Sequence, residues 1–184
     1  MKLNKRGFTL IELLGVLVIL GLVLVFTMPD VINKINLGNK NTYEMLKENM
    51  KTGAESYVNE CSTSSSLYNV YLIDKDSNIN DISNKYNISN ELICSSIGIN
   101  ECDSNYLIKK DTVILIPYTC NAIYDKTTLS AIELVYNGFL KGNKDKRVIR
   151  SMDNKDVSTC LKVEINYDKE SYKYSYIIND KECE

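Results

Sequence analysis

Six cysteines and one isolated carboxylate are the residues of this chain whose types and spacing could do chemistry. The cysteines are Cys61, Cys94, Cys102, Cys120, Cys160 and Cys183. The carboxylate is Glu12, the single charged residue of the apolar run from Phe8 to Met28. The chain has no histidine, which excludes Ser-His-Asp and Cys-His catalysis and imidazole metal sites. No glycine-rich phosphate loop or dinucleotide-binding turn is present either. We therefore expect no catalytic residues, no cofactor and no metal.

Length and composition limit what can position these residues. The chain has 184 residues, of which 44% are hydrophobic and 25% charged, with only two prolines and eight glycines. These values are typical of one ordinary globular domain with an appendage, and exclude a large multidomain enzyme.

The first 28 residues predict a membrane span. Residues 1–7 carry three basic side chains and no acid, so they form a positive flank that stays in the cytoplasm. The 21 residues from Phe8 to Met28 would form a helix of roughly 30 Å, the thickness of the hydrocarbon layer. A secretory signal peptide is disfavoured because no small-residue cleavage site follows, and the first cysteine, Cys61, lies too late for a lipoprotein. A plain single-pass anchor remains open.

The segment Lys5-Arg6-Gly7-Phe8-Thr9-Leu10-Ile11-Glu12-Leu13-Leu14 resembles the class III leader and helix start of type IV pilins and pseudopilins. The resemblance covers about residues 1–60. It implies that a prepilin peptidase cuts between Gly7 and Phe8 and methylates the new amine of Phe8. Gly21 and Pro29 stand where many members of that family have a helix-loosening glycine and a kink proline.

Glu12 has a physical reason to act in assembly. A carboxylate in an apolar environment is costly unless it is paired, and cleavage would create an amine on Phe8 near the same level of the membrane. We expect the Phe8 amine of a neighbouring subunit to pair with Glu12 and set the stagger between subunits. The alternative is that Glu12 reaches the membrane interface and has no such role. Pro29 likewise either kinks the helix or marks its exit from the membrane.

After Pro29, apolar residues recur at helical spacing. Ile35 begins the series, which continues with Leu46, Met50, Ala54, Tyr57 and Cys61. The spacing predicts that the helix continues as an amphipathic half. We therefore expect a leader at 1–7, a helix at 8–60 with 8–28 in the membrane or filament core, and an extracytoplasmic head at 61–184. The expected fold is α+β: a long N-terminal helix packed on a small antiparallel sheet.

Within the head, the pattern predicts short helices at Ile79–Tyr86 and Asn90–Ile97, although residues 67–110 are the hardest part to read. Thr112–Pro117 is predicted to be a buried strand that the proline ends, and Leu129–Phe139 could be helix or strand. Alternating residues after Cys160 predict a hairpin. A loop at Asp168–Ser171 would place Tyr167 opposite Tyr172, Ile165 opposite Tyr174 and Val163 opposite Tyr176.

All six cysteines follow the predicted membrane span and would lie outside the cytoplasm. An even number there favours three disulfides, with fifteen possible pairings. Cys160 with Cys183 is favoured because it would bracket the hairpin, as the C-terminal disulfide of many pilins does, and Cys94 with Cys102 would close a short loop. Free thiols or a thiolate zinc site are the alternatives.

A basic run at residues 141–150 is either a solvated loop or a docking site for DNA or an acidic neighbour. The run consists of Lys141, Lys144, Lys146, Arg147 and Arg150. Removal of the leader would leave 19 basic against 24 acidic side chains, so the overall charge does not favour nucleic acid.

These features together predict a structural subunit of a pilus. Its partners would be its own copies or other pilins, the prepilin peptidase and the assembly machinery. It would be a single-pass protein of the cytoplasmic membrane before assembly and part of a cell-surface pilus afterwards. The alternatives are a pseudopilin of a type II secretion or DNA-uptake system, and a membrane-anchored binding module that never polymerises.

Overall fold

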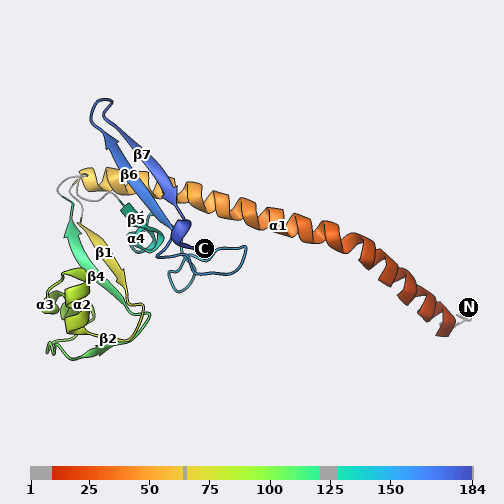
Figure 1. Ribbon diagram of the computed structural model, residues 1–184, viewed down its shortest axis with the longest axis horizontal. Coiled ribbons are helices and arrows are strands. Elements are labelled where there is room, and N and C mark those ends of the chain that lie inside the picture. The colour runs from red at the N-terminus through yellow and green to blue at the C-terminus, as the bar shows by residue number, and fades with distance from the viewer. Residues whose placement is uncertain (1–9, 64–65, 121–127, 184) are drawn as a thin grey trace, which may run out of the picture.

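The computed structural model describes residues 10–63, 66–120 and 128–183, and of Phe26 the backbone alone. A single long helix, α1 (Leu10–Ser62), projects from a small head, and the N-terminal end of this helix lies far from the head (Figure 1). The head contains short helices and antiparallel strands. The predicted α+β layout of a long N-terminal helix and small antiparallel sheets is therefore confirmed.

The helix α1 continues through Pro29 but is bent. The parts Leu10–Val25 and Thr27–Ser62 meet at an angle of 41°. Proline has no N–H, so in a helix Pro29 leaves the carbonyl of Val25 without its usual donor, and its ring crowds the preceding turn. The bend lies beside this carbonyl, one turn before the proline.

The head is built from short elements in a fixed order. In chain order they are β1 (Ser66–Leu72), β2 (Ser77–Asn78), α2 (Ile79–Tyr86), α3 (Asn90–Ser96), β3 (Leu107–Ile108), β4 (Val113–Thr119), β5 (Thr128–Ser130), α4 (Ala131–Tyr136), β6 (Lys162–Asp168), β7 (Lys173–Asn179) and the 3-10 turn η2 (Lys181–Cys183). Among the described residues, β1 pairs with β4, β2 with β3, and β5, β6 and β7 form a sheet in that order. The two short helices predicted before residue 100 are confirmed, and the ambiguous segment after Leu129 is a strand followed by a helix.

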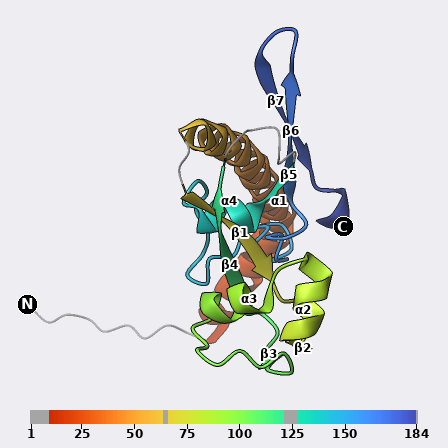
Figure 2. The ribbon, with the colours of Figure 1, turned by 90° about the vertical axis from the view of Figure 1, so that its left-hand side faces the viewer.

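Two separate cores hold the head together. In the first core, the C-terminal third of α1 packs on α4, β6 and β7 (Figure 2). The second core is made largely of isoleucines and lies between α2, α3 and the strands β3 and β4. We call residues 73–116 the outer lobe. Figure 1 shows α2 and α3 grouped at the end of the β1–β4 pair that points away from α1.

The predicted register of the C-terminal hairpin is wrong by two residues. Tyr167 lies opposite Tyr174 and Ile165 lies opposite Tyr176, so the loop begins one residue later than expected. The reason is local: Asp168 accepts a hydrogen bond from the backbone N–H of Glu170, and Tyr172 has a left-handed φ of 54°, which takes it out of the strand. A shift of two residues keeps each side chain on its predicted face.

Pro117 does not end its strand, contrary to the prediction. The strand β4 runs through it to Thr119, with Pro117 opposite Tyr68 of β1. The backbone N–H of Tyr68 donates to Oδ1 of Asn137, and Nδ2 of Asn137 donates to the carbonyl of Tyr68. Because the backbone N–H and carbonyl of Tyr68 bond to Asn137, the pairing of β1 with β4 requires no N–H from Pro117 at this position.

Gly53 allows α1 to approach the head closely. A Cβ atom added at Gly53 would lie 2.6 Å from the backbone oxygen of Phe139, which is too near for any side chain. The ring of Phe139 also packs edge-on against Tyr57, with the centroids 5.8 Å apart. This contact fixes the distance between α1 and the segment after α4.

We expect Gly53→Ala to lower the free energy of unfolding by about 1–3 kcal/mol, because the backbone at Phe139 must move. Gly38→Ala is the matched control: it lies in the same helix, and a Cβ atom added there would meet no atom within 4 Å, so the alanine should be neutral or stabilising. Thermal and denaturant unfolding of the detergent-solubilised chain measures both. Equal effects of the two substitutions would show that the close contact has no energetic role.

Candidate assembly surface

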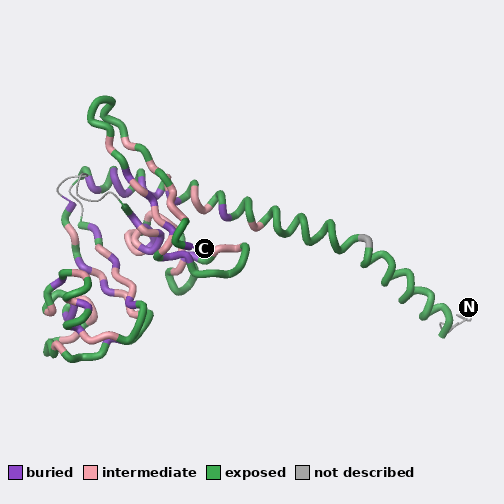
Figure 3. The backbone as a smooth tube through the Cα atoms, in the orientation of Figure 1, coloured by how far each residue is buried: buried purple, intermediate pink, exposed green. Residues whose placement is uncertain are grey.

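The projecting part of α1 is an apolar surface with nothing from the head covering it. Every large apolar side chain described between Leu10 and Leu37 is exposed, with exposed fractions from 47% to 86% (Figure 3). Soluble monomers rarely expose contiguous apolar patches of this size, so lipid or protein must cover it. Tested by length and hydropathy over the described residues, no single helix qualifies as a membrane span, whereas the bent pair Leu10–Val25 and Thr27–Ser62 does.

Glu12 and Gly21, two of the residues singled out from the sequence, lie on this surface. Gly7 and Phe8 lie outside the described residues. Glu12 is in the first described turn of α1 and is exposed. A Cβ atom at Gly21 would meet no atom within 4 Å. Glu12 and Gly21 therefore lie where a second molecule could reach them, in the part of α1 that extends away from the head.

The predicted amphipathic face is confirmed only for the part of α1 that the head covers. Met50, Ala54 and Tyr57 are buried, and Leu46 packs on the same core. Ile35, which shares the predicted spacing, is 55% exposed because the buried part of the helix begins at Tyr43. The segment between Pro29 and Tyr43 is therefore helical but uncovered.

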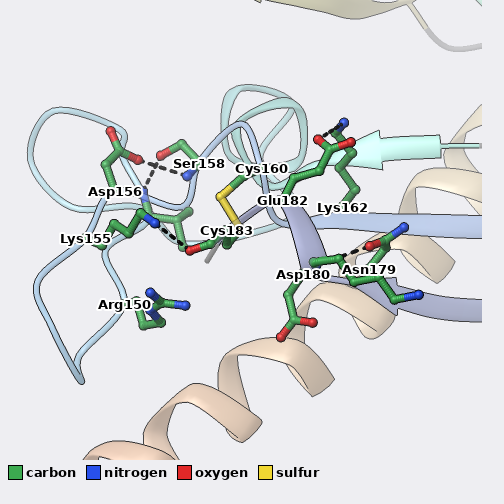
Figure 4. The surroundings of a disulfide bond; sticks show 12 residues. Arg150, Lys155, Asp156, Ser158, Cys160, Lys162, Asn179, Asp180, Glu182 and Cys183 are labelled. Carbon is green, nitrogen blue, oxygen red and sulfur yellow. Dashed lines mark hydrogen bonds and ion pairs between the residues drawn. A yellow bond between two sulfur atoms is a disulfide. The ribbon is translucent and has the colours of Figure 1, made fainter.

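A C-terminal clasp fastens the head to α1. We use this name for Lys155, Lys162 and the segment 180–183, together with Cys160 (Figure 4). Cys160 is bonded to Cys183, Lys155 Nζ donates to the carbonyl of Cys183 at 2.7 Å, and Lys162 Nζ lies 2.7 Å from a carboxylate oxygen of Glu182. The end of the chain is thereby held in the first core.

Asp180 links this clasp directly to the helix. Its Oδ2 lies 2.8 Å from Nζ of Lys47 and accepts a hydrogen bond from the hydroxyl of Tyr43 at 3.3 Å. In Figure 4 the carboxylate of Asp180 points toward α1. The hydrogen bond from Lys47 holds the pKa of Asp180 below its usual value, while partial burial raises the pKa of Tyr43. Asp180 is therefore ionised, and Tyr43 neutral, across the physiological range.

All six cysteines are paired in the structure. Besides Cys160–Cys183, which is the pairing favoured from the sequence, Cys94 is bonded to Cys102 and Cys61 to Cys120. The bond Cys61–Cys120 joins the last turn of α1 to the residue after β4, so it closes the base of the outer lobe. Among the described residues, no group of three or more acidic or cysteine side chains could hold a metal ion.

Most side chains of the basic run at 141–150 make contacts within the head. The guanidinium of Arg150 binds both carboxylate oxygens of Asp153, at 2.9 and 2.6 Å, and the Arg150 guanidinium lowers the pKa of Asp153 to about 2. Nζ of Lys146 lies 4.7 Å from the centroid of the Tyr136 ring. Asp153, three residues after Arg150, is the local signal in the sequence that points to this ion pair. Lys141, Lys144 and Lys146 remain exposed.

The structure thus has the layout of a protein that is anchored or assembled through an exposed N-terminal helix. Residues 2–28 match the family model of the prokaryotic N-terminal methylation motif, which is the class III prepilin leader of type IV pilin-like proteins. The motif indicates a protein of the type IV pilin or pseudopilin kind, a structural family that is typically non-enzymatic. No curated protein and no solved structure matches the chain.

Proposed function

We propose that this chain is the precursor of a structural pilus subunit, a type IV pilin or minor pilin. Residues 1–7 are the leader, which a prepilin peptidase removes between Gly7 and Phe8 before methylating the amine of Phe8. Residues 8–60 are the assembly helix, with 8–28 in the membrane and later in the filament core. Residues 61–184 are the head, outside the cytoplasmic membrane and then on the cell surface.

The match of residues 2–28 to the methylation motif is the observation that carries this proposal. The structure supports it independently, since residues 10–28 of this match belong to a helix whose apolar side chains are exposed from Leu10 to Leu37. When the helix leaves the membrane, its apolar side chains lose their contact with lipid. The helices of neighbouring subunits then bury them. The head is small, disulfide-bonded and fastened to the far end of the helix, so it can leave the helix free for assembly.

Glu12 is proposed to set the register between subunits. In a filament core the carboxylate is far from bulk water, and its cost is offset when the Phe8 amine of a neighbour pairs with it. Few other registers of the two helices bring these charges together. Gly21 and Pro29 are proposed to let the helix extend locally as subunits pack, since glycine and the missing hydrogen bond at Val25 both lower the cost of changing the backbone there.

Two other functions follow from the same motif or helix. A pseudopilin of a type II secretion or DNA-uptake system would use the same leader and helix, and the exposed lysines Lys141, Lys144 and Lys146 could contact DNA. A membrane-anchored binding module that never polymerises would retain the helix without assembly. The pilus subunit is favoured over the anchored module because the cleavage motif and Glu12 occur together at the start of the helix, two features that a pseudopilin shares.

Processing tests the proposal directly. We expect mass spectrometry of the mature protein to find an N-terminal Phe8 that carries one methyl group. Gly7→Glu is expected to leave the precursor intact with Met1 or its neighbour at the N-terminus, because a bulky charged side chain replaces the glycine at the cut. Lys5→Gln is the matched control in the same leader and should still be cleaved. An uncut wild-type chain in cells that contain a prepilin peptidase would refute the pilin function.

A further inference from the structure

Asn137 and Gly138 form the only Asn-Gly step of the chain, and this step directly follows α4. Such a step can react with itself. The backbone nitrogen of the glycine attacks Cγ of the asparagine, because glycine has no side chain that hinders the approach. A C–N bond forms and closes a five-membered succinimide ring, while the side-chain amide leaves as ammonia. Water then opens the ring to aspartate or isoaspartate, so water is the only co-reactant.

In the folded head, hydrogen bonds hold the side chain of Asn137 on β1. Its Oδ1 accepts from the backbone N–H of Tyr68 at 2.8 Å, and its Nδ2 donates to the carbonyls of Tyr68 and Glu133, each at 2.9 Å. The amide thus binds Tyr68 as the backbone of a neighbouring strand would, with one acceptor and one donor. The side chain can turn toward Gly138 only after these bonds break.

The attacking nitrogen is also held. The backbone N–H of Gly138 donates to the carbonyl of Val135 at 3.1 Å, and the glycine has a left-handed φ of 83°. The nitrogen must lose its proton before it attacks, and a bonded N–H gives up its proton only when the structure opens locally. Gly138 is exposed and Asn137 half-buried, so water reaches both groups once they open.

We propose that Asn137-Gly138 is a deamidation site that is closed while β1 is docked on α4 and opens when β1 separates from it. The product carboxylate has no donor for the carbonyls of Tyr68 and Glu133, and isoaspartate also lengthens the backbone at the end of α4. The reaction therefore weakens the attachment of β1, and with it that of the outer lobe, in one direction only. The inference concerns the head alone and does not depend on the proposed function.

Peptide mass spectrometry of the detergent-solubilised full chain measures the reaction, because the exchange of ammonia for water changes the mass. We incubate the folded protein at mildly alkaline pH beside the same protein unfolded in guanidinium with a reductant. We expect conversion of Asn137 to be at least about a hundredfold slower in the folded protein, since it must wait for local opening. Equal rates in the two states would overturn the proposal.

Removal of the bond between Cys61 and Cys120 tests whether β1 is the gate. This bond joins the last turn of α1 to the residue after β4, the strand that pairs with β1. We expect the Cys61→Ala and Cys120→Ala double variant to convert Asn137 about tenfold faster than the wild-type protein. The matched control removes Cys94–Cys102 within the outer lobe and should change the rate by less than about twofold. Equal acceleration in both variants, or in neither, would overturn the gating by β1.

Amide hydrogen exchange provides a second test that needs no variant. The N–H of Tyr68 is released by the same separation that frees the side chain of Asn137. Low concentrations of guanidinium should therefore raise the exchange rate of Tyr68 and the conversion rate of Asn137 in parallel. Conversion that accelerates while Tyr68 stays protected would contradict the proposed gate.

The effect on β1 is tested with Asn137→Asp, which has the side chain of one product. We expect the N–H of Tyr68 to exchange at least about tenfold faster, because the carboxylate faces carbonyl oxygens without a donor. Asn143→Asp is the matched control, since Oδ1 of Asn143 accepts from the backbone N–H groups of Asp145 and Arg147 and a carboxylate accepts equally well. Unchanged exchange at Tyr68 in Asn137→Asp would refute the weakening of β1.

Discussion

A Glu12→Leu variant is expected to be inserted, cleaved at Gly7 and methylated at Phe8 like the wild-type protein, but to form no filaments. Leucine suits the lipid as well as its neighbours Leu13 and Leu14 do, so insertion is not impaired. In the filament, however, the amine of Phe8 in the adjoining subunit loses its counter-charge. Removing one partner of a buried ion pair costs about 3–5 kcal/mol, and this cost recurs at every subunit.

Sheared-surface preparations and electron microscopy measure the filaments, while mass spectrometry of the membrane fraction checks cleavage and methylation. Leu13→Val is the matched control, since it changes an adjacent exposed side chain of the same helix turn without altering charge. Glu12→Gln separates charge from polarity, and we expect it to fail in assembly as well. Normal filaments from Glu12→Leu would eliminate the register role of this carboxylate.

Loss of the bond between Cys160 and Cys183 is expected to release the C-terminal end of the head. The bond spans 23 residues, and the chain-entropy estimate for a loop of that length is about 3 kcal/mol of stability. The Cys160→Ala and Cys183→Ala double variant avoids a buried hydroxyl, since Cys183 is fully buried. Asp180 and Lys155 would then hold the segment by polar contacts alone.

Thermal unfolding gives the size of this effect, and amide hydrogen exchange gives its place. We expect faster exchange in β7 and in residues 180–183 but unchanged exchange in α2 and α3. The matched control removes Cys94–Cys102, whose eight-residue separation lies within the outer lobe, and it should accelerate exchange in α3 instead. Wild-type stability and exchange in the first double variant would show that the clasp does not depend on its disulfide.

The sequence predicted elements whose signal is local. The apolar spacing from Leu46 to Cys61 and the alternation after Cys160 each reflect burial of one face, and both elements form as predicted. The hairpin register could not be read off the same pattern, because a shift by two residues preserves every face. It depends on the turn at Asp168 and on the left-handed backbone of Tyr172.

Contacts between distant parts of the chain could not be predicted from local sequence patterns. The strand continues through Pro117 because the side chain of Asn137, twenty residues later, hydrogen-bonds to the backbone N–H and carbonyl of Tyr68, the residue opposite Pro117. The groove between the helix at 42–49 and the loop 141–151 likewise combines two segments about one hundred residues apart. Local signals at the N-terminus were sufficient for the motif, whereas the surfaces of the head emerge only when the chain is folded.

The outer lobe has a consequence for what the protein can display. Its core contains no residue of α1, and the helix packs instead on α4, β6 and β7. The lobe begins directly after β1 and its last four residues belong to β4, the strand that pairs with β1 and leads to Cys61–Cys120. Neighbouring strands lie about 4.8 Å apart, so a replacement that keeps the β4 residues and has ends at this spacing can occupy the same position. The lobe is therefore an exchangeable module: natural divergence or a grafted epitope can rewrite it while the packing of α1 on α4, β6 and β7 keeps its geometry.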